Sequence, residues 1–584
     1  MRSTFHQLFI ILRPAFRKKL IILQLLLLIG VVLESVSLGM VLPVIGVLTG
    51  EGKPTSRWMA LIDRFFHSFS GSTSLIAVLL AFVVFYLLKT LFLCFLVWRQ
   101  AGFTSELSQD ISARLFQAYQ SRPYQFFLQQ HSAVLMKNIV SEVNGFTAWV
   151  QALLQLQTEL SVIAGIALAL IWLQPLAALL IAVFMGLVGY GLVRLSRRRV
   201  SGWGRSKQQY DALRSKTILE SLTGFREIKL FMAQSFFFRR FYNATQGYYR
   251  SQRKIQFLSQ TQRYYLEFVV IAAGAVFCLA GVMRSQSFVA TLPTLSLFLF
   301  AALRLLPSAN RAVVGLQNMR FTEASITLIR RELEEEPVVP VDTALTAKRT
   351  ITSSIRLNNI SYRFPGSAGP VLENITLELK AGSITGLMGE TGAGKTTLAN
   401  ILTGLLKPTH GQILIDGIAA ADLDGPLHEY IGYVPQQVFL IDDTLRSNIA
   451  FGVPDDEIDP ARLQQVLYAT KLTDMVKVMP QGLDTIIGER GMRISGGQQQ
   501  RIGIARALYR QAPALIIDEG TNALDGETED GVLEAIGGLK GAHIVLLITH
   551  RRSSLHICDT VFILVAGSCQ PSAISRQLLA VSGK

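Results

Sequence analysis

Six apolar stretches in the first half of the chain constrain its fold more than any other feature of the sequence. They cover residues 20–49, 73–98, 152–173, 176–195, 265–284 and 291–312. A helix that crosses a lipid bilayer needs about 20 predominantly apolar residues, so each stretch is long enough to span. We therefore predict a multidomain chain that begins with an all-α transmembrane domain of six helices, over residues 1–345.

Basic residues flank these stretches and predict their orientation. The start of the chain is basic, and so are the segments around Arg99, Arg114 and Arg122 and the run 194–199. Lys and Arg accumulate on cytoplasmic loops, so we expect both termini and two long helical loops inside. The first stretch has no cleavage site after it and is expected to remain as a membrane helix. The net charge of +15 follows from this topology, and nucleic-acid binding is not expected.

A second apolar pattern lies between the first two stretches. Five large apolar side chains recur there at helical spacing between Trp58 and Phe69. The pattern predicts a short helix outside the membrane that lies in the lipid interface. The alternative is a stripe that packs on the neighbouring spans.

The second half of the chain contains a phosphate-binding loop of the form G-x-x-x-x-G-K-[ST]. Residues 346–584 alternate strand and helix patterns, which indicates an α/β ATPase domain. The loop glycines let backbone N–H groups face phosphates at the start of a helix, Lys395 balances phosphate charge, and Thr396 offers a hydroxyl to Mg²⁺. The expected nucleotide-binding residues of this loop are Gly389, Gly392, Gly394, Lys395, Thr396 and Thr397.

Later motifs supply the remaining candidates for phosphoryl transfer. The apolar strand 515–517 delivers Asp518 to the metal, and Glu519 follows as the general base for the attacking water. Gln436 and His550 are placed to orient water, metal and γ-phosphate. A second helix start can also hold a phosphate through its N–H groups. Its residues are Ser495, Gly496, Gly497 and Gln498, Asp525 completes the nucleotide-binding set, and the expected metal ligands are Thr396, Gln436 and Asp518.

The order of these motifs resembles the nucleotide-binding domain of ABC transporters, and six spans with two long internal loops resemble the exporter class. The resemblance implies ATP and Mg²⁺ as cofactors and Tyr362 as the aromatic residue that stacks on adenine, and the alternative for Tyr362 is a structural tyrosine of the strand. It implies that residues 122–127 and 224–231 are docking helices, which contact the ATPase near 488–491. The alternative is that both segments are ordinary amphipathic loop helices. It also implies that the Ser495 signature serves the nucleotide of the opposite subunit, so we expect a homodimer with two ATP sites.

Cationic residues within the spans indicate the cargo. Lys89, Arg263 and Arg304 lie near or within the predicted spans, where ionisable groups are costly and mark pathways or partners. They suggest an anionic headgroup, and the alternative is that they reach the inner interface or pair locally, as Arg263 would with Glu267. The segments 34–39 and 304–311 resemble the bacterial lipid-linked oligosaccharide flippases.

These features together predict ATP-driven export or flipping of an amphipathic, anionic, lipid-linked substrate across a bacterial-type inner membrane. Membrane lipid and a second copy of the chain are the expected partners. A multidrug or lipid A-type exporter is the alternative within the same class. An ATP-gated channel or regulator is the alternative from another class, and two intact hydrolytic sites argue against it.

Overall fold

The chain divides into two compact units in the computed structural model. The described residues are 2–39, 72–173, 175–283, 288–334, 349–367, 369–488, 494–518, 526–565 and 567–571. The first unit consists of Met1–Arg122 and Gln129–Pro340, and the second of Pro123–Leu128 and Val341–Lys584. The domain boundary expected at residue 345, the apolar stripe at Trp58 and the patch 489–491 lie outside the described residues.

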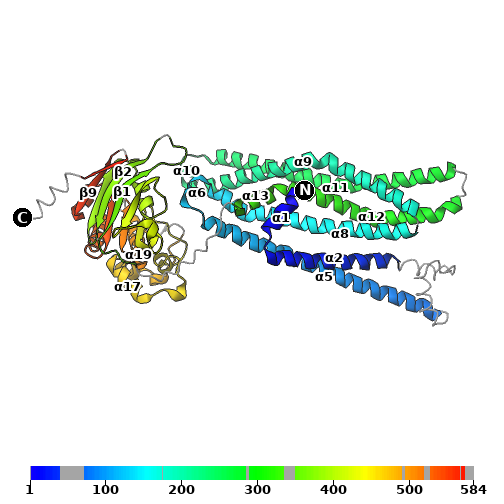
Figure 1. Ribbon diagram of the computed structural model, residues 1–584, viewed down its shortest axis with the longest axis horizontal. Coiled ribbons are helices and arrows are strands. Elements are labelled where there is room, and N and C mark those ends of the chain that lie inside the picture. The colour runs from blue at the N-terminus through cyan, green and yellow to red at the C-terminus, as the bar shows by residue number, and fades with distance from the viewer. Residues whose placement is uncertain are drawn as a thin grey trace, which may run out of the picture. The chain divides into compact units, whose positions relative to one another are not determined.

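The first unit is built from helices (Figure 1). Each predicted span falls on one of them as far as its residues are described, and the first span is described to Gly39. The helices are α1 (Arg2–Ile11), α2 (Pro14–Gly39), α5 (Ser72–Gln120), α7 (Ser132–Lys137), a π-helix (Asn138–Glu142), α8 (Val143–Leu173), α9 (Pro175–Thr223), α10 (Phe225–Leu230), α11 (Gln234–Met283), α12 (Phe288–Phe321) and α13 (Glu323–Glu334).

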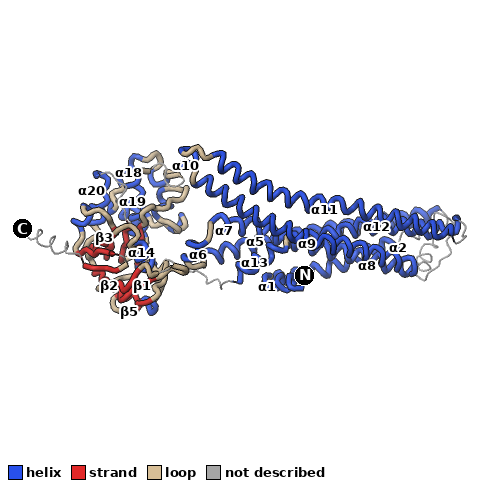
Figure 2. Tube along the Cα trace, turned by 90° about the horizontal axis from the view of Figure 1, so that it is seen from above, coloured by secondary structure: helices blue, strands red, loops and turns tan. Residues whose placement is uncertain are grey.

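Three helices continue far beyond the length that a bilayer needs. α5, α9 and α11 contain 49, 49 and 50 residues, against the about 20 of a simple span. α9 packs along α11, and α8 packs along α12 (Figures 1 and 2). Among the described residues, Leu79–Gln120 and Ser132–Ala167 are long and apolar enough to cross a membrane.

The last membrane helix is interrupted near its carboxyl end. Thr322 separates α12 from α13. The Thr322 hydroxyl donates to the backbone oxygen of Asn318 at 2.9 Å. Back-bonding of a threonine to the preceding turn bends helices slightly, and the same bond lies within unbroken helices at Thr147 and Thr217.

The two predicted docking segments each contain a short helix. α6 (Tyr124–Gln129) lies in the first and α10 (Phe225–Leu230) in the second. Residues Pro123–Leu128 group with the second unit, although the chain on both sides of them belongs to the first.

The second unit contains two sheets covered by helices (Figure 2). The larger has six strands in the order β10-β9-β3-β8-β7-β6, and the smaller has four in the order β2-β1-β4-β5. The strands are β1 (Ser354–Tyr362), β2 (Leu372–Lys380), β3 (Ile384–Gly389), β4 (His410–Ile415), β5 (Ile418–Ala419), β6 (Ile431–Val434), β7 (Ala514–Asp518), β8 (Ile544–Ile548), β9 (Thr560–Val565) and β10 (Ser568–Pro571). The helices are α14 (Lys395–Leu402), α15 (Leu427–Tyr430), α16 (Leu445–Ile449), α17 (Pro460–Ala469), α18 (Thr473–Val478), α19 (Gly496–Tyr509) and α20 (Gly526–Gly537).

The parallel part of the larger sheet determines where the functional motifs meet. β3 pairs in parallel with β8 and β9, and β7 pairs in parallel with β6 and β8. β7 and β8 are buried along their whole length, as expected for central parallel strands covered on both faces. Ligands of such sheets bind beyond the carboxyl ends of the strands. The phosphate loop, Gln436, Asp518 and His550 all lie at the carboxyl ends of β3, β6, β7 and β8.

Candidate functional site

The phosphate loop connects the carboxyl end of β3 to the start of α14, and close packing leaves no room for a larger residue at two of its glycines. A Cβ added to Gly389 would lie 2.5 Å from the backbone oxygen of Leu564. Gly394 has a φ of +102°, in the left-handed region that favours glycine. A Cβ there would lie 2.7 Å from the Leu372 side chain. The loop can therefore present the N–H groups at the start of α14 to an anion.

Lys395 lies inside this loop and contacts the predicted histidine. Its Nζ donates to the backbone oxygens of Gly389 at 2.9 Å and Glu390 at 3.0 Å, and lies 2.8 Å from Nε2 of His550. An ammonium group only donates, so Nε2 of His550 is the acceptor when Lys395 is charged. The fold thus joins the loop lysine to a histidine 155 positions later in the chain.

Thr396 and Asp518 form an oxygen pair beside the loop. The hydroxyl of Thr396 donates to Oδ2 of Asp518 at 3.3 Å, and Asp518 is 3% exposed. Hydroxyl and carboxylate oxygens are the hard ligands that Mg²⁺ prefers. The residues present therefore fit Mg²⁺. When ATP is bound, this ion would neutralise part of the negative charge of its phosphates. Gln436, the third expected ligand, follows β6 and is exposed.

Tyr433 is a member of the site that the sequence analysis did not identify. Its hydroxyl donates to the same Oδ2 of Asp518 at 3.0 Å. Burial, and then the charge and the hydrogen bond of Asp518, raise the pKa of Tyr433, so the phenol remains a donor. Tyr433 is paired with Ile516 of the adjacent strand. Because side chains alternate along a strand, Ile516 and Asp518 lie on the same face of the sheet, and so does Tyr433. This alternation is the signal in the sequence that could have identified Tyr433.

The signature segment begins α19 with a reciprocal cap. Oγ of Ser495 accepts from the N–H of Gln498 at 3.3 Å, and Oε1 of Gln498 accepts from the N–H of Ser495 at 3.0 Å. Gly496 and Gly497 form the first turn of the helix. One turn later, Nε2 of Gln500 donates to the backbone oxygen of Gln436 at 2.6 Å. The signature helix is therefore tied to the glutamine segment. Glu519 and Asp525 lie outside the described residues.

The position of Tyr362 requires a correction. The side chain is 4% exposed within the apolar core of β1 and β2, because strand alternation turns it inward. Its ring meets the ring of Phe364 edge to face, with centroids 4.9 Å apart. A residue covered in this way has no free face for adenine. Phe364 is half-buried and lies two residues later, directly before the Pro365-Gly366 turn.

Lys89 is paired with a carboxylate in the neighbouring helix. Its Nζ lies 2.7 Å from Oε2 of Glu34 and donates to the hydroxyl of Ser37 at 3.0 Å. The side chains of Lys89 and Glu34 are 7% and 8% exposed. A buried ion pair thus joins α2 and α5. Lys89 therefore fits the alternative given above, in which a membrane cation pairs locally.

The other predicted membrane cations differ in their environments. Arg263 pairs with Glu267 one turn later at 2.7 Å, with 67% of its side chain exposed. Arg304 lies on α12, and its side chain is outside the described residues. Arg311, in the same segment, forms an ion pair with Glu159 of α8. Of the residues predicted to meet a cargo, the structure therefore places Lys89 and Arg263 in ion pairs.

Comparisons with known proteins place both units in one family. Residues 372–522 match the family model described as ABC transporter, and residues 20–305 match the one described as ABC transporter transmembrane region. A Ralstonia nicotianae protein described as an ATP-dependent lipid A-core flippase is 30% identical over 80% of this chain and 79% of its own length. A Chromobacterium violaceum protein of the same description is 30% identical over 86% of both chains.

A solved structure has the same fold over nearly the whole chain. It is titled as a bacterial Atm1-family ABC exporter with ATP bound, and it superposes with a TM-score of 0.78 at 22% identity, covering 98% of this chain and 97% of its own. The expected helical membrane domain followed by an α/β ATPase domain is therefore confirmed. The chain belongs to the ABC transporter family, as an exporter-type half-transporter whose ATPase domain binds ATP with Mg²⁺ and couples its hydrolysis to transport.

Proposed function

We propose that this chain flips an anionic glycolipid from the inner to the outer leaflet of a bacterial inner membrane. The relatives named above support a lipid A-core type of cargo. A lipid-linked oligosaccharide shares the same chemistry, an acyl or polyprenyl tail joined to a phosphate-bearing sugar headgroup. The basic residues next to the spans support an orientation with both termini and the ATPase unit in the cytoplasm.

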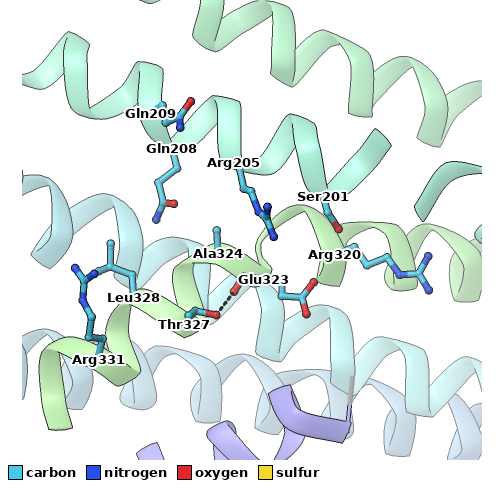
Figure 3. Close-up of a pocket in the computed structure, with 10 residues that line it drawn as sticks. All are labelled: Ser201, Arg205, Gln208, Gln209, Arg320, Glu323, Ala324, Thr327, Leu328 and Arg331. Atoms are coloured by element: carbon cyan, nitrogen blue, oxygen red, sulfur yellow. Dashed lines mark hydrogen bonds between the residues drawn. The ribbon is translucent and has the colours of Figure 1, made fainter. Parts of the chain in front are cut away.

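A cavity in the membrane unit carries this proposal. It has a volume of about 500 Å³ and lies between α9 and the α12–α13 segment, beyond the predicted spans 176–195 and 291–312. Figure 3 shows Arg205 extending from α9 toward the opposite wall. The lining residues are Ser201, Arg205, Gln208, Gln209, Arg320, Glu323, Ala324, Thr327, Leu328 and Arg331.

The chemistry of this cavity suits a phosphate group. Three arginines line it against one carboxylate, that of Glu323. A guanidinium binds phosphate through paired, charge-assisted hydrogen bonds. Burial lowers the pKa of Arg320 most, Arg197 lowers it further and Glu323 raises it. With three arginines and one carboxylate, the lining creates a net positive potential. An anionic headgroup would offset that potential, and a cationic drug would increase it.

Replacing Arg205 with Gln tests this assignment. A hydrogen bond to a charged group contributes about 1.5–3 kcal/mol, and about 1.4 kcal/mol is tenfold in affinity. We expect the lipid concentration that half-stimulates ATPase to rise about tenfold for lipid A-core in nanodiscs of neutral lipid. A polyprenyl-pyrophosphate oligosaccharide is tested alongside. The lipid that stimulates the ATPase of the unmodified protein identifies the cargo type.

Arg330→Gln provides the matched control. Arg330 neighbours Arg331 on α13 but pairs with Glu334 at 2.8 Å and does not line the cavity. It should leave stimulation by lipid unchanged. Equal stimulation curves for Arg205→Gln and Arg330→Gln would remove the cavity from the cargo path, and stimulation of the unmodified protein by lipophilic cations alone would favour a drug exporter.

The active assembly is proposed to be a homodimer. The chain contains one membrane unit and one ATPase unit, and the signature is a separate helix start from the phosphate loop. Two copies would supply two loops and two signatures, each signature serving the nucleotide of the other copy. Each nanodisc is expected to hold a protein mass of twice 64.5 kDa. Nanodiscs that hold one copy and still hydrolyse ATP would contradict the proposal.

Phe364 is proposed to stack on adenine in place of Tyr362. Stacking of a base on an aromatic ring contributes about 1–3 kcal/mol, so Phe364→Ala should weaken ATP binding on the order of tenfold. Tyr362→Phe should bind ATP normally, because its hydroxyl is buried without a hydrogen-bond partner among the described residues. A fluorescent ATP analogue measures both affinities, and normal binding of ATP by Phe364→Ala would contradict the proposed adenine contact.

A further inference from the structure

The carboxylate of Asp518 accepts a hydrogen bond from a tyrosine of the neighbouring strand as well as one from the phosphate loop. Tyr433 lies on β6 and Asp518 at the end of the adjacent strand β7. Oδ2 of Asp518 accepts one hydrogen bond from Tyr433 at 3.0 Å and one from Thr396 at 3.3 Å. We propose that Tyr433 is a positioning residue, which fixes the Asp518 carboxylate in the orientation that binds Mg²⁺ together with Thr396.

The geometry supports this role because the tyrosine is itself held in place. β6 pairs with β7 in parallel over Ile431–Val434, so the Tyr433 backbone is fixed to the strand that carries Asp518. Asp518 is 3% exposed, and a buried carboxylate needs hydrogen-bond donors to remain in one orientation. Groups that orient a metal ligand in this way typically change metal affinity by about 10–100-fold when removed.

The inference concerns the metal rather than the cargo, so it does not depend on which lipid is moved. Loss of the hydroxyl should reduce the contribution of Mg²⁺ to nucleotide binding, while the phosphate loop and the adenine contacts remain. A purely structural role for Tyr433 would instead lower stability and weaken nucleotide binding equally with and without metal.

The experiment measures binding of a fluorescent ATP analogue to the full-length protein in nanodiscs, without turnover, across a titration of Mg²⁺ and in EDTA. For Tyr433→Phe we expect the half-saturating Mg²⁺ concentration to rise about tenfold, with affinity in EDTA unchanged. Unaltered Mg²⁺ dependence, or an equal loss with and without metal, would overturn the proposal.

Tyr509→Phe is the matched control. It also removes one tyrosine hydroxyl from the ATPase unit, one that accepts from the N–H of Asp459 at 2.9 Å, away from the site. Its thermal stability should fall while its Mg²⁺ dependence stays normal. In an Asp518→Asn background, Tyr433→Phe should have no further effect on Mg²⁺ dependence, because the hydroxyl acts through that carboxylate. An additive effect in the double variant would contradict the proposed role.

Discussion

Asp518→Asn is expected to lower ATP hydrolysis by about a hundredfold or more. The amide keeps the size of the side chain but removes the negative charge that faces Thr396 and Tyr433. Metal ions contribute several kcal/mol to phosphoryl transfer, and each loss of about 1.4 kcal/mol is tenfold in rate. Steady-state phosphate release from the purified protein, at increasing Mg²⁺ concentration, measures the effect.

Glu519→Gln separates metal binding from water activation. Glu519 is the proposed general base, so this variant should bind ATP with normal Mg²⁺ dependence and yet nearly stop hydrolysis. Asp518→Asn should lose the Mg²⁺ dependence of binding as well. If Asp518→Asn hydrolyses ATP at a near-normal rate in saturating Mg²⁺, its proposed role as metal ligand is wrong. Rapid turnover by Glu519→Gln would likewise remove the general-base assignment.

The sequence could indicate which residues gather at the phosphate site because the motifs are local and the sheet is parallel. The loop lies between one strand and one helix, and parallel strands bring their carboxyl ends to one edge. This edge brings Lys395 and His550 together in the structure. The assignment of Tyr362 was wrong because the motif has two aromatic residues two positions apart, and only the sheet decides which side chain points inward. Tyr433 was missed because its role depends on the register of β6 against β7.

Charge pairing in the membrane unit could not be predicted at the same level. The length and polarity of the stretches were sufficient to predict helices at the described parts of the proposed spans. They do not determine which faces of two helices meet, and the pairing of Lys89 with Glu34 depends on that. The π-helix at Asn138–Glu142 could not be predicted from the spacing of apolar residues either. Lys137 and Glu142, buried at its two ends, form an ion pair across it.

The ion pair between Glu34 and Lys89 leads to the second large prediction. Lys89→Met removes the positive charge and leaves Glu34 buried without it, which is expected to destabilise the protein by about 3–5 kcal/mol. Glu34→Gln should lower stability by a similar amount, because Lys89 then stays buried without the carboxylate that balances its charge. The yield of folded protein and the thermal unfolding temperature in detergent measure both losses.

The double variant Glu34→Gln/Lys89→Met decides between a structural pair and a cargo-binding cation. Because neither charge remains, its stability should recover most of the loss seen in either single variant, and transport should return with it. Arg263→Met is the control, since its ion pair with Glu267 is largely exposed and such pairs contribute about 0–1 kcal/mol. If the single Lys89 variant is stable but inactive, and the double variant stays inactive, then Lys89 acts on the cargo. A stable, active double variant instead means that the anionic headgroup is bound elsewhere, as proposed for the three arginines that line the cavity between α9 and the α12–α13 segment.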